Sequence, residues 1–363
     1  MVEISSFLKQ IISLPGLSGS EDPVRAVIAD AWKPLVDEIS ISRTGSLHGL
    51  KRGTGPEPRP RILLAAHMDA IGMMVTQIMD GFLRFTEIGG IDDRILPGQL
   101  VTVHTSQQDL PAMVVQPTDS LLKPGSKGKP VMMADLFIDT GLLPEEVNRL
   151  VRVGDLVSFA QEPIELAGDT LAGHSMDNRT SVAAVTACLK ELSKIRHAWD
   201  VWAVATVQEE ETMLGGFTSP FQIRPDIGIA IDVTFAKSPG ASDYRTFPLG
   251  KGITIGMGPN VHPELYRAFK ELAEKLDIPF KVEIMPQHSG TDAYGIQVAE
   301  GGVPTMVLGI PLRYMHTPVE LVALKDIERA GHLMAEFIAR LEPDYVQTLI
   351  DSFNKPSEEK KGE

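Results

Sequence analysis

The second half of the sequence alternates between short apolar runs and longer amphipathic segments, and this alternation constrains the fold most. The apolar runs predict buried strands over 201–207, 227–231, 281–285 and 303–309. Helical spacing of apolar residues predicts helices over 178–194, 263–276 and 323–341. Strands and helices in alternation are typical of an α/β fold with a mostly parallel sheet flanked by helices.

The first 70 residues share this pattern. Apolar positions with helical spacing predict helices over 1–14 and 22–38, and the run 61–66 predicts another buried strand. From about residue 71 to residue 160, short runs rich in Val, Ile, Phe and Thr alternate with Gly, Pro and Asp. This texture predicts a β-rich module with tight turns, and its Pro-, Gly- and Lys-rich stretch 118–130 predicts an exposed loop.

The domain organisation follows from these patterns. We expect one α/β domain formed by residues 1–69 and 164–346, interrupted by a smaller β-rich insertion over 70–163. The C-terminal residues 347–363 end in a strongly polar stretch, and we expect them to be disordered.

Charge and cysteine content exclude several classes of function. The formal net charge of −14 argues against binding to nucleic acid or to an anionic membrane. The single cysteine, Cys188, lies in an apolar run and cannot form an intrachain disulfide, which fits a reducing compartment. The N-terminal residues lack the pattern of a signal peptide, and no apolar run is long enough to span a bilayer. We therefore expect a cytoplasmic protein.

Side chains that can bind metals lie at the ends of predicted strands. His67 follows the strand 61–66, with Asp69 two residues later, a spacing that suits a ligand and the carboxylate that orients it. Three glutamates, 209–211, follow the strand 201–207, and Asp232 follows the strand 227–231. Open parallel sheets bind ligands at this edge. For the glutamates alone, a solvated acidic turn is the competing interpretation.

Two further residues complete the set. Asp177 directly precedes a predicted helix, where a carboxylate is favoured, although an ordinary helix cap would look the same. His316 follows the last predicted strand. The ligand set is then His67, Asp177, Glu210, Asp232 and His316.

This set points to two metal ions in one site. Imidazole and carboxylate together suit zinc, cobalt or manganese, not calcium. One catalytic zinc ion needs about three protein ligands and a water, so five ligands exceed its needs. If one carboxylate bridges, each of two cations roughly 3.5–4 Å apart has three protein ligands and an open position. The site is then suited to hydrolysis.

The motifs in their order resemble the M42 family of metallo-aminopeptidases, which includes glutamyl and deblocking aminopeptidases and the tetrahedral (TET) peptidases. The segments that carry the resemblance are AAHMD, MDNR, VQEE, AIDV, HSGTDA and RYMHTPVE, with GGIDDRILPGQLVTVH in the insertion. The resemblance extends to about residue 345. It implies an aminopeptidase that removes N-terminal residues from peptides, and an insertion that forms dimers, which in this family often build dodecamers.

The resemblance also implies a role for each residue. His67 and Asp232 hold one metal ion, Glu210 and His316 hold the other, and Asp177 bridges the two. Glu209 is the general base and Asp69 orients His67. The metals implied are zinc or cobalt, with manganese as an alternative.

Two positions depart from the family pattern. Ala70 stands where the family often has an acidic residue, and Glu211 makes a third consecutive glutamate. The third glutamate leaves two registers open for base and ligand, Glu209 with Glu210 or Glu210 with Glu211. Gly215 falls where the family's later glycine is expected in the first register, which we adopt.

Substrate contacts are less clearly marked. Glu211 is a candidate for binding the free α-amino group, and Thr291 and Asp292 in HSGTDAYG are candidates for the first substrate pocket, although this stretch would also form a turn by itself. Two other functions remain open at this point. One is removal of acyl groups from amino acids, and the other is a structural shell protein with a relict site.

Overall fold

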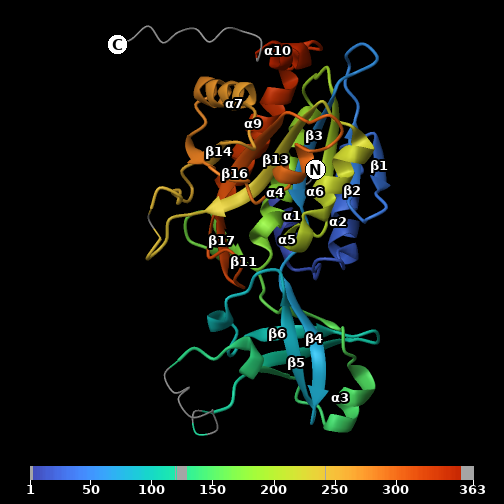
Figure 1. The fold of residues 1–363 in the computed structure, drawn as a ribbon, viewed down its shortest axis with the longest axis vertical. Coiled ribbons are helices and arrows are strands. Elements are labelled where there is room, and N and C mark those ends of the chain that lie inside the picture. The colour runs from blue at the N-terminus through green and yellow to red at the C-terminus, as the bar shows by residue number, and fades with distance from the viewer. Residues whose placement is uncertain (1–2, 119, 121–128, 242, 353–363) are drawn as a thin grey trace.

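The computed structural model describes residues 3–118, 120, 129–241 and 243–352, which form an α/β unit and a smaller β-barrel placed end to end (Figure 1). In the described residues, no helix is long and apolar enough to cross a membrane.

A mixed sheet of eleven strands forms the centre of the α/β unit. Its order begins with β1 (Glu38–Ile41), β2 (Leu47–Lys51), β12 (Asp200–Thr206), β3 (Arg61–His67) and β13 (Ile227–Phe235). It continues through β16 (Thr305–Arg313), β17 (Glu320–Ala323), β11 (Thr170–Gly173) and β10 (Ile164–Leu166). Two more strands, β14 (Ile253–Met257) and β15 (Phe280–Ile284), branch from β16.

The central strands are parallel and the flanking strands are antiparallel. Neighbours in the row β12–β3–β13–β16 run parallel, as do β14 and β15. The expected α/β fold is confirmed, and the parallel arrangement holds for this central part. The antiparallel flanks were not expected, because short strands such as β1 and β17 leave little hydrophobic pattern in the sequence.

Helices cover this sheet (Figure 1). They are α1 (Ile4–Ile12), α2 (Asp22–Trp32), α4 (Met176–Leu192), α5 (Glu209–Thr212), α6 (Leu214–Ile223), α7 (Pro263–Lys275), α8 (Ala293–Ile296), α9 (Leu324–Ala339) and α10 (Tyr345–Ser352). Helix α4 contacts α1, α9, β3 and β13, so nearly all of its side chains are buried. A helix buried all round brings its polar residues into the interior, where they need partners.

The insertion is a closed barrel with a core of its own. Its strands in order are β4 (Gly72–Met79), β5 (Phe82–Ile88), β8 (Phe137–Asp139), β7 (Asp109–Val115), β6 (Leu100–His104) and β9 (Leu156–Phe159). Short helices η1 (Asp93–Ile95), η2 (Met133–Asp135) and α3 (Pro144–Leu150) lie beside them. These elements fall within the expected insertion, 70–163. Most of the predicted loop 118–130 lies outside the described residues.

Two expectations about helices were wrong. Helix α2 ends at Trp32 and not at residue 38, because Pro34 has no backbone N–H to continue the helical hydrogen bonds and its ring clashes with the preceding turn. Residues 347–352, expected to be disordered, belong to helix α10, whose Leu349 is buried while Tyr345 and Val346 pack on the core. The rest of the expected tail, 353–363, lies outside the described residues.

Candidate metal centre

Strand register brings His67 and Asp232 to the same level of the sheet, and helix α4 adds Asp177. His67, the last residue of β3, pairs with Thr206 of β12, just before the three glutamates. Ala65 pairs with Ala230, so Asp232 lies two residues further along β13, level with His67. Asp177 is in the first turn of α4, which packs against β3 and β13. Strand β3 ends at His67 as predicted, whereas β13 continues to Phe235, so Asp232 lies within that strand and not at its end.

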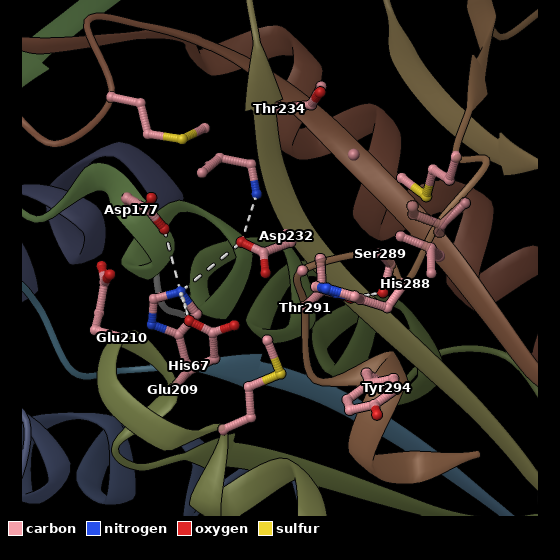
Figure 2. A pocket seen from close by; sticks show the side chains of 18 of the residues that line it. His67, Asp177, Glu209, Glu210, Asp232, Thr234, His288, Ser289, Thr291 and Tyr294 are labelled. Carbon is pink, nitrogen blue, oxygen red and sulfur yellow. Dashed lines mark hydrogen bonds and ion pairs between the residues drawn. The ribbon is translucent and has the colours of Figure 1, made fainter. Parts of the chain in front are cut away.

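The side chains converge on Asp177, whose two oxygens face different histidines. Figure 2 shows its contact with His67. Its Oδ1 lies 3.1 Å from His67 Nε2, and its Oδ2 lies 3.4 Å from His316 Nε2. Asp232 Oδ1 lies 3.8 Å from the same His67 nitrogen, and Glu210 Oε2 lies 3.3 Å from His316 Nε2. Asp177 thus stands between two groups of donors.

These two groups fit two divalent cations. His67, Asp177 and Asp232 offer donor atoms within 4.8 Å of one another, and Asp177, Glu210 and His316 do the same. Glu210 Oε1 is buried and has no hydrogen-bond partner among the residues that the structure describes, which is costly for a carboxylate unless a cation binds it. The mixed nitrogen and oxygen donors suit zinc, cobalt or manganese.

The pKa values of the buried carboxylates also indicate that the two donor groups lack positive charge. Burial raises the pKa of Glu209 to about 10, and the carboxylates of Asp232 and Glu210 add to this effect. Burial likewise raises the pKa of Asp232 well above its usual value. Although burial lowers the pKa of His316, hydrogen bonds to Asp177 and Glu210 raise it to about 11. Divalent cations supply the charge that these carboxylates otherwise draw from a proton.

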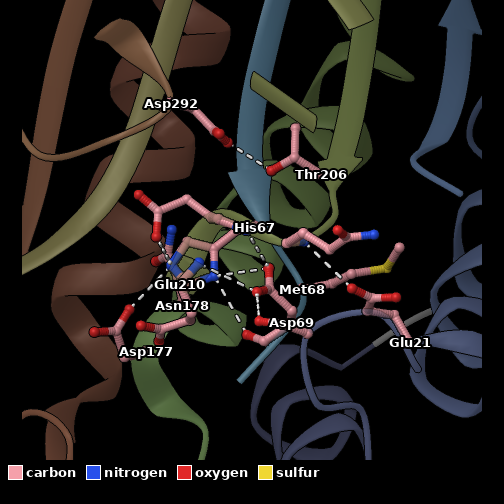
Figure 3. A network of polar contacts seen from close by, with 12 residues as sticks. Glu21, His67, Met68, Asp69, Asp177, Asn178, Thr206, Glu210 and Asp292 are labelled. Carbon is pink, nitrogen blue, oxygen red and sulfur yellow. Dashed lines mark hydrogen bonds and ion pairs between the residues drawn. The ribbon is translucent and has the colours of Figure 1, made fainter. Parts of the chain in front are cut away.

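Asp69 connects the histidine with the glutamate turn (Figure 3). Its Oδ1 lies 3.5 Å from His67 Nδ1, on the side of the ring away from Asp177. Its oxygens also accept the backbone N–H groups of Glu209 and Glu210 at 3.1 and 3.2 Å, and the Ser18 hydroxyl at 2.5 Å. Asp69 therefore contacts both the ring of His67 and the turn that carries Glu209 and Glu210.

The three glutamates take different directions. Glu209 Oε2 lies 3.7 Å from His67 Nε2, beside the donor groups, and Glu210 is in the second donor group. Glu211 Oε1 instead accepts the backbone N–H of Gly89, at the end of barrel strand β5, at 2.6 Å. This geometry favours the register in which Glu209 and Glu210 are the base and the ligand.

Sequence reasoning missed two buried residues that support the centre. Glu320 accepts the backbone N–H groups of Asp177 and His316 at 3.2 and 2.8 Å. Arg179 donates to four backbone carbonyls, among them that of Met68, which lies between His67 and Asp69. Both residues stand in quoted motifs, HTPVE and MDNR, but no sequence signal shows that a side chain will bind backbone groups far along the chain.

A cavity of about 620 Å³ opens onto the donor groups. Glu211 and Thr291 line it. His288, Ser289 and Tyr294 also line it, on the side away from His67 (Figure 2). Asp292 does not line this cavity. Its Oδ2 accepts the Thr206 hydroxyl at 2.5 Å, so the carboxylate points toward β12 (Figure 3).

Comparison with known proteins gives the family. The family model described as M42 glutamyl aminopeptidase matches residues 45–333, which is most of the chain. The chain belongs to the M42 peptidase family. The lysyl aminopeptidase of Pyrococcus furiosus is 34% identical over 341 residues, with 93% of this chain and 97% of that protein covered.

Solved M42-like structures agree with this assignment. The TET aminopeptidase of a marine sediment archaeon of the Thaumarchaeota superposes with a TM-score of 0.90 at 29% identity, covering 95% of this chain and 98% of that one. The TET1 peptidase of Pyrococcus horikoshii, described as assembling into a tetrahedron or a large octahedral shell, gives a TM-score of 0.81 at 30% identity, covering 93% and 100%. The predictions of an M42 member, and of a hydrolase that removes N-terminal residues from peptides, are confirmed.

Proposed function

We propose that this M42 enzyme holds two divalent cations in one site, zinc or cobalt first and manganese as an alternative. The observation that carries the proposal is the position of Asp177, whose two oxygens face His67 and His316 separately at 3.1 and 3.4 Å. His67 and Asp232 would hold one cation, Glu210 and His316 the other, and Asp177 both. When bound, the cations polarise the scissile carbonyl and acidify a water molecule.

Glu209 is the general base in this proposal. Its carboxylate lies beside the donor groups, 3.7 Å from His67, and takes the proton of the attacking water. It then passes this proton to the leaving amine, so one residue acts as base and then as acid. Asp69 keeps Glu209 in place by accepting its backbone N–H at 3.1 Å.

Substrate contacts come from the walls of the cavity. Glu211 and Thr291 line it, and we assign them to the N-terminal residue of the peptide. A carboxylate such as Glu211 can accept a free α-ammonium group as a charge-assisted hydrogen bond. Asp292 is already bound to Thr206, so it supports the cavity from behind and is not assigned to substrate.

The test combines metal removal with two matched substrates. The purified protein is treated with chelator and dialysed, and each metal is then added back singly. We expect activity on leucine p-nitroanilide to vanish on chelation and to return with about two equivalents of zinc, cobalt or manganese. N-acetyl-leucine p-nitroanilide should stay uncleaved. Release of acetate from the acetylated substrate, in preference to release of p-nitroaniline from the free one, would support removal of acyl groups instead. Full activity without metal would contradict the proposal.

The assembly we propose is a homo-oligomer in the cytoplasm, built from dimers joined through the barrel and extending to a tetrahedral dodecamer. The TET1 assemblies support the oligomer, and the single buried cysteine, Cys188, supports a reducing compartment. Peptides are the proposed partners, and the net charge of −14 argues against nucleic acid and membranes.

A further inference from the structure

Glu283 is a further carboxylate that lines the active-site cavity outside the two donor groups. Glu283 lies on β15 and is half-buried. Its Oε1 accepts the Thr234 hydroxyl at 2.7 Å, and its Oε2 accepts the Thr254 hydroxyl at 2.6 Å. Burial raises the pKa of Glu283, and the two hydroxyl groups act against that shift by stabilising the charged form. Each oxygen keeps a free lone pair for another donor.

The Glu283 carboxylate lies close to the candidate metal centre, at a distance that one amino-acid side chain can span. Thr234 follows Asp232 by two residues on β13, so both side chains point to the same face (Figure 2). Two residues along a strand span roughly 6.5 Å. Because Glu283 is bound to Thr234, its carboxylate lies about that far along the sheet from a proposed metal ligand.

Gly309 keeps the space between these groups open. It pairs with Asp232 on one side and with Thr254 on the other, so it lies between the proposed ligand and the carboxylate's partner. A Cβ atom at this position would clash with the Thr254 hydroxyl and would lie 3.1 Å from Glu283 Oε2. Glycine therefore lets Glu283 and Thr254 approach each other over β16.

Apolar residues form part of the cavity wall. Phe235, Met285 and Leu308 line the cavity, and no lysine or arginine is among the described residues that line it. Apolar walls that lead to a carboxylate match a long aliphatic stem that ends in a cation. An acidic side chain would meet repulsion from Glu283.

We propose that Glu283 makes this enzyme selective for peptides whose first residue is basic, lysine or arginine. The inference rests on the proposed function, because it assigns the end of the same cavity. The charged end of the substrate side chain would bind the free lone pairs of Glu283, while its stem contacts Met285.

The test uses probes that differ only in the terminal ammonium group. Lysine and norleucine p-nitroanilides have stems of similar length, and the zinc-, cobalt- or manganese-loaded protein is assayed with both. We expect kcat/KM for lysine to exceed that for norleucine by roughly 10- to 100-fold. Glu283→Gln should remove most of this ratio. Glu271→Gln, at an exposed site on α7, should leave the ratio unchanged.

Several outcomes would overturn the inference. A wild-type ratio near or below one overturns it while leaving the aminopeptidase function intact. A Glu283→Gln variant that loses both activities equally, with the ratio preserved, shows a merely structural role. If neither substrate is cleaved, the proposed function fails, and calorimetric titration with L-lysine amide and L-norleucine amide decides the selectivity. Equal binding of the two amides then contradicts it, and tighter binding of the lysine amide supports it.

Discussion

At the scale of single residues, the run of three glutamates shows how neighbours acquire different environments. Glu209 and Glu210 face the donor groups, and Glu211 is turned toward the barrel by the backbone N–H of Gly89. Adjacent identical side chains therefore have different neighbours, because a turn of helix α5 points them in different directions.

Exchange of Glu209 for glutamine is expected to separate chemistry from metal binding. Glu209→Gln should lower kcat roughly 100- to 10,000-fold, because an amide cannot take the proton of the attacking water. Metal content by mass spectrometry should stay near that of the wild type. Glu211→Gln is the matched control, and it should keep its metal and much more of its activity. Loss of metal in Glu211→Gln with normal turnover in Glu209→Gln would favour the alternative register.

We expect the buried side chain of His48 to make the free energy of unfolding depend on pH. The ring is buried, with Nε2 3.0 Å from the Ser219 hydroxyl, and burial lowers its pKa to about 4, against about 6.5 in an unfolded chain. Between these values the unfolded chain binds the proton more readily. The stabilisation is therefore fully present above pH 6.5 and is lost as the pH falls toward 4. At pH 5 the loss amounts to about 2 kcal/mol.

The measurement is urea unfolding at pH 7.5 and pH 5. His48→Gln should lose less stability between these pH values than the wild type, by about 2 kcal/mol. Buried His174, whose pKa burial lowers to about 3, remains in both proteins, so some acid destabilisation persists in the variant. Equal losses in the two proteins would show that His48 does not contribute.

At the scale of elements, helix α4 connects the core with the metal centre. Its first turn carries Asp177, and the next residues place Arg179 beneath the loop that follows β3. The guanidinium group also binds the carbonyls of Ile11, Leu14 and Gly16. One buried side chain thus joins α1, α4 and β3 near the proposed ligands.

Removal of this guanidinium group should destabilise the whole α/β unit. Arg179→Met keeps the apolar stem but leaves four carbonyls without their donor, at a cost of about 3 kcal/mol. The thermal midpoint should fall by roughly 5 °C, and metal affinity should weaken as well. Arg340→Met, which removes an exposed ion pair with Glu336 on α9, should change the midpoint by less than about 1 °C. Similar effects in both variants would contradict the role given to Arg179.

At the scale of the whole molecule, the barrel presents exposed apolar side chains beside an acidic α/β unit. Leu100 and Met113 are cross-strand partners on β6 and β7, with 61% and 48% of their surfaces exposed. An apolar pair of this kind on a small barrel is typical of a contact with another chain.

Charge introduced at this pair should therefore dissociate the oligomer. We expect Leu100→Lys combined with Met113→Lys to lower the mass measured by light scattering at least twofold, because two buried lysines would meet their symmetry mates. Ile41→Lys on β1, where the side chain is 56% exposed, is the control in the α/β unit. Dissociation by the control alone would place the contact outside the barrel.

The sequence by itself determined the elements whose pattern is local. Long apolar runs and helical spacing predicted β3, β12, β13, α4, α7 and α9, and the change of texture near residue 71 predicted the insertion. His67 and Asp232 were readable as candidate ligands because they directly follow apolar runs, and Asp177 because it precedes a predicted helix.

Only the tertiary structure decided the contacts that join distant segments. Glu320 and Arg179 bind backbone groups, which leave no trace in side-chain pattern, and Glu283 reaches the cavity only because four strands place it beside Thr234, Thr254 and Gly309. The hydrogen bonds of Asp292 with Thr206 and of Glu211 with Gly89 are likewise made with residues far along the chain. Hydrophobic periodicity depends on adjacent residues, whereas the partner of a buried polar group depends on how the whole chain packs.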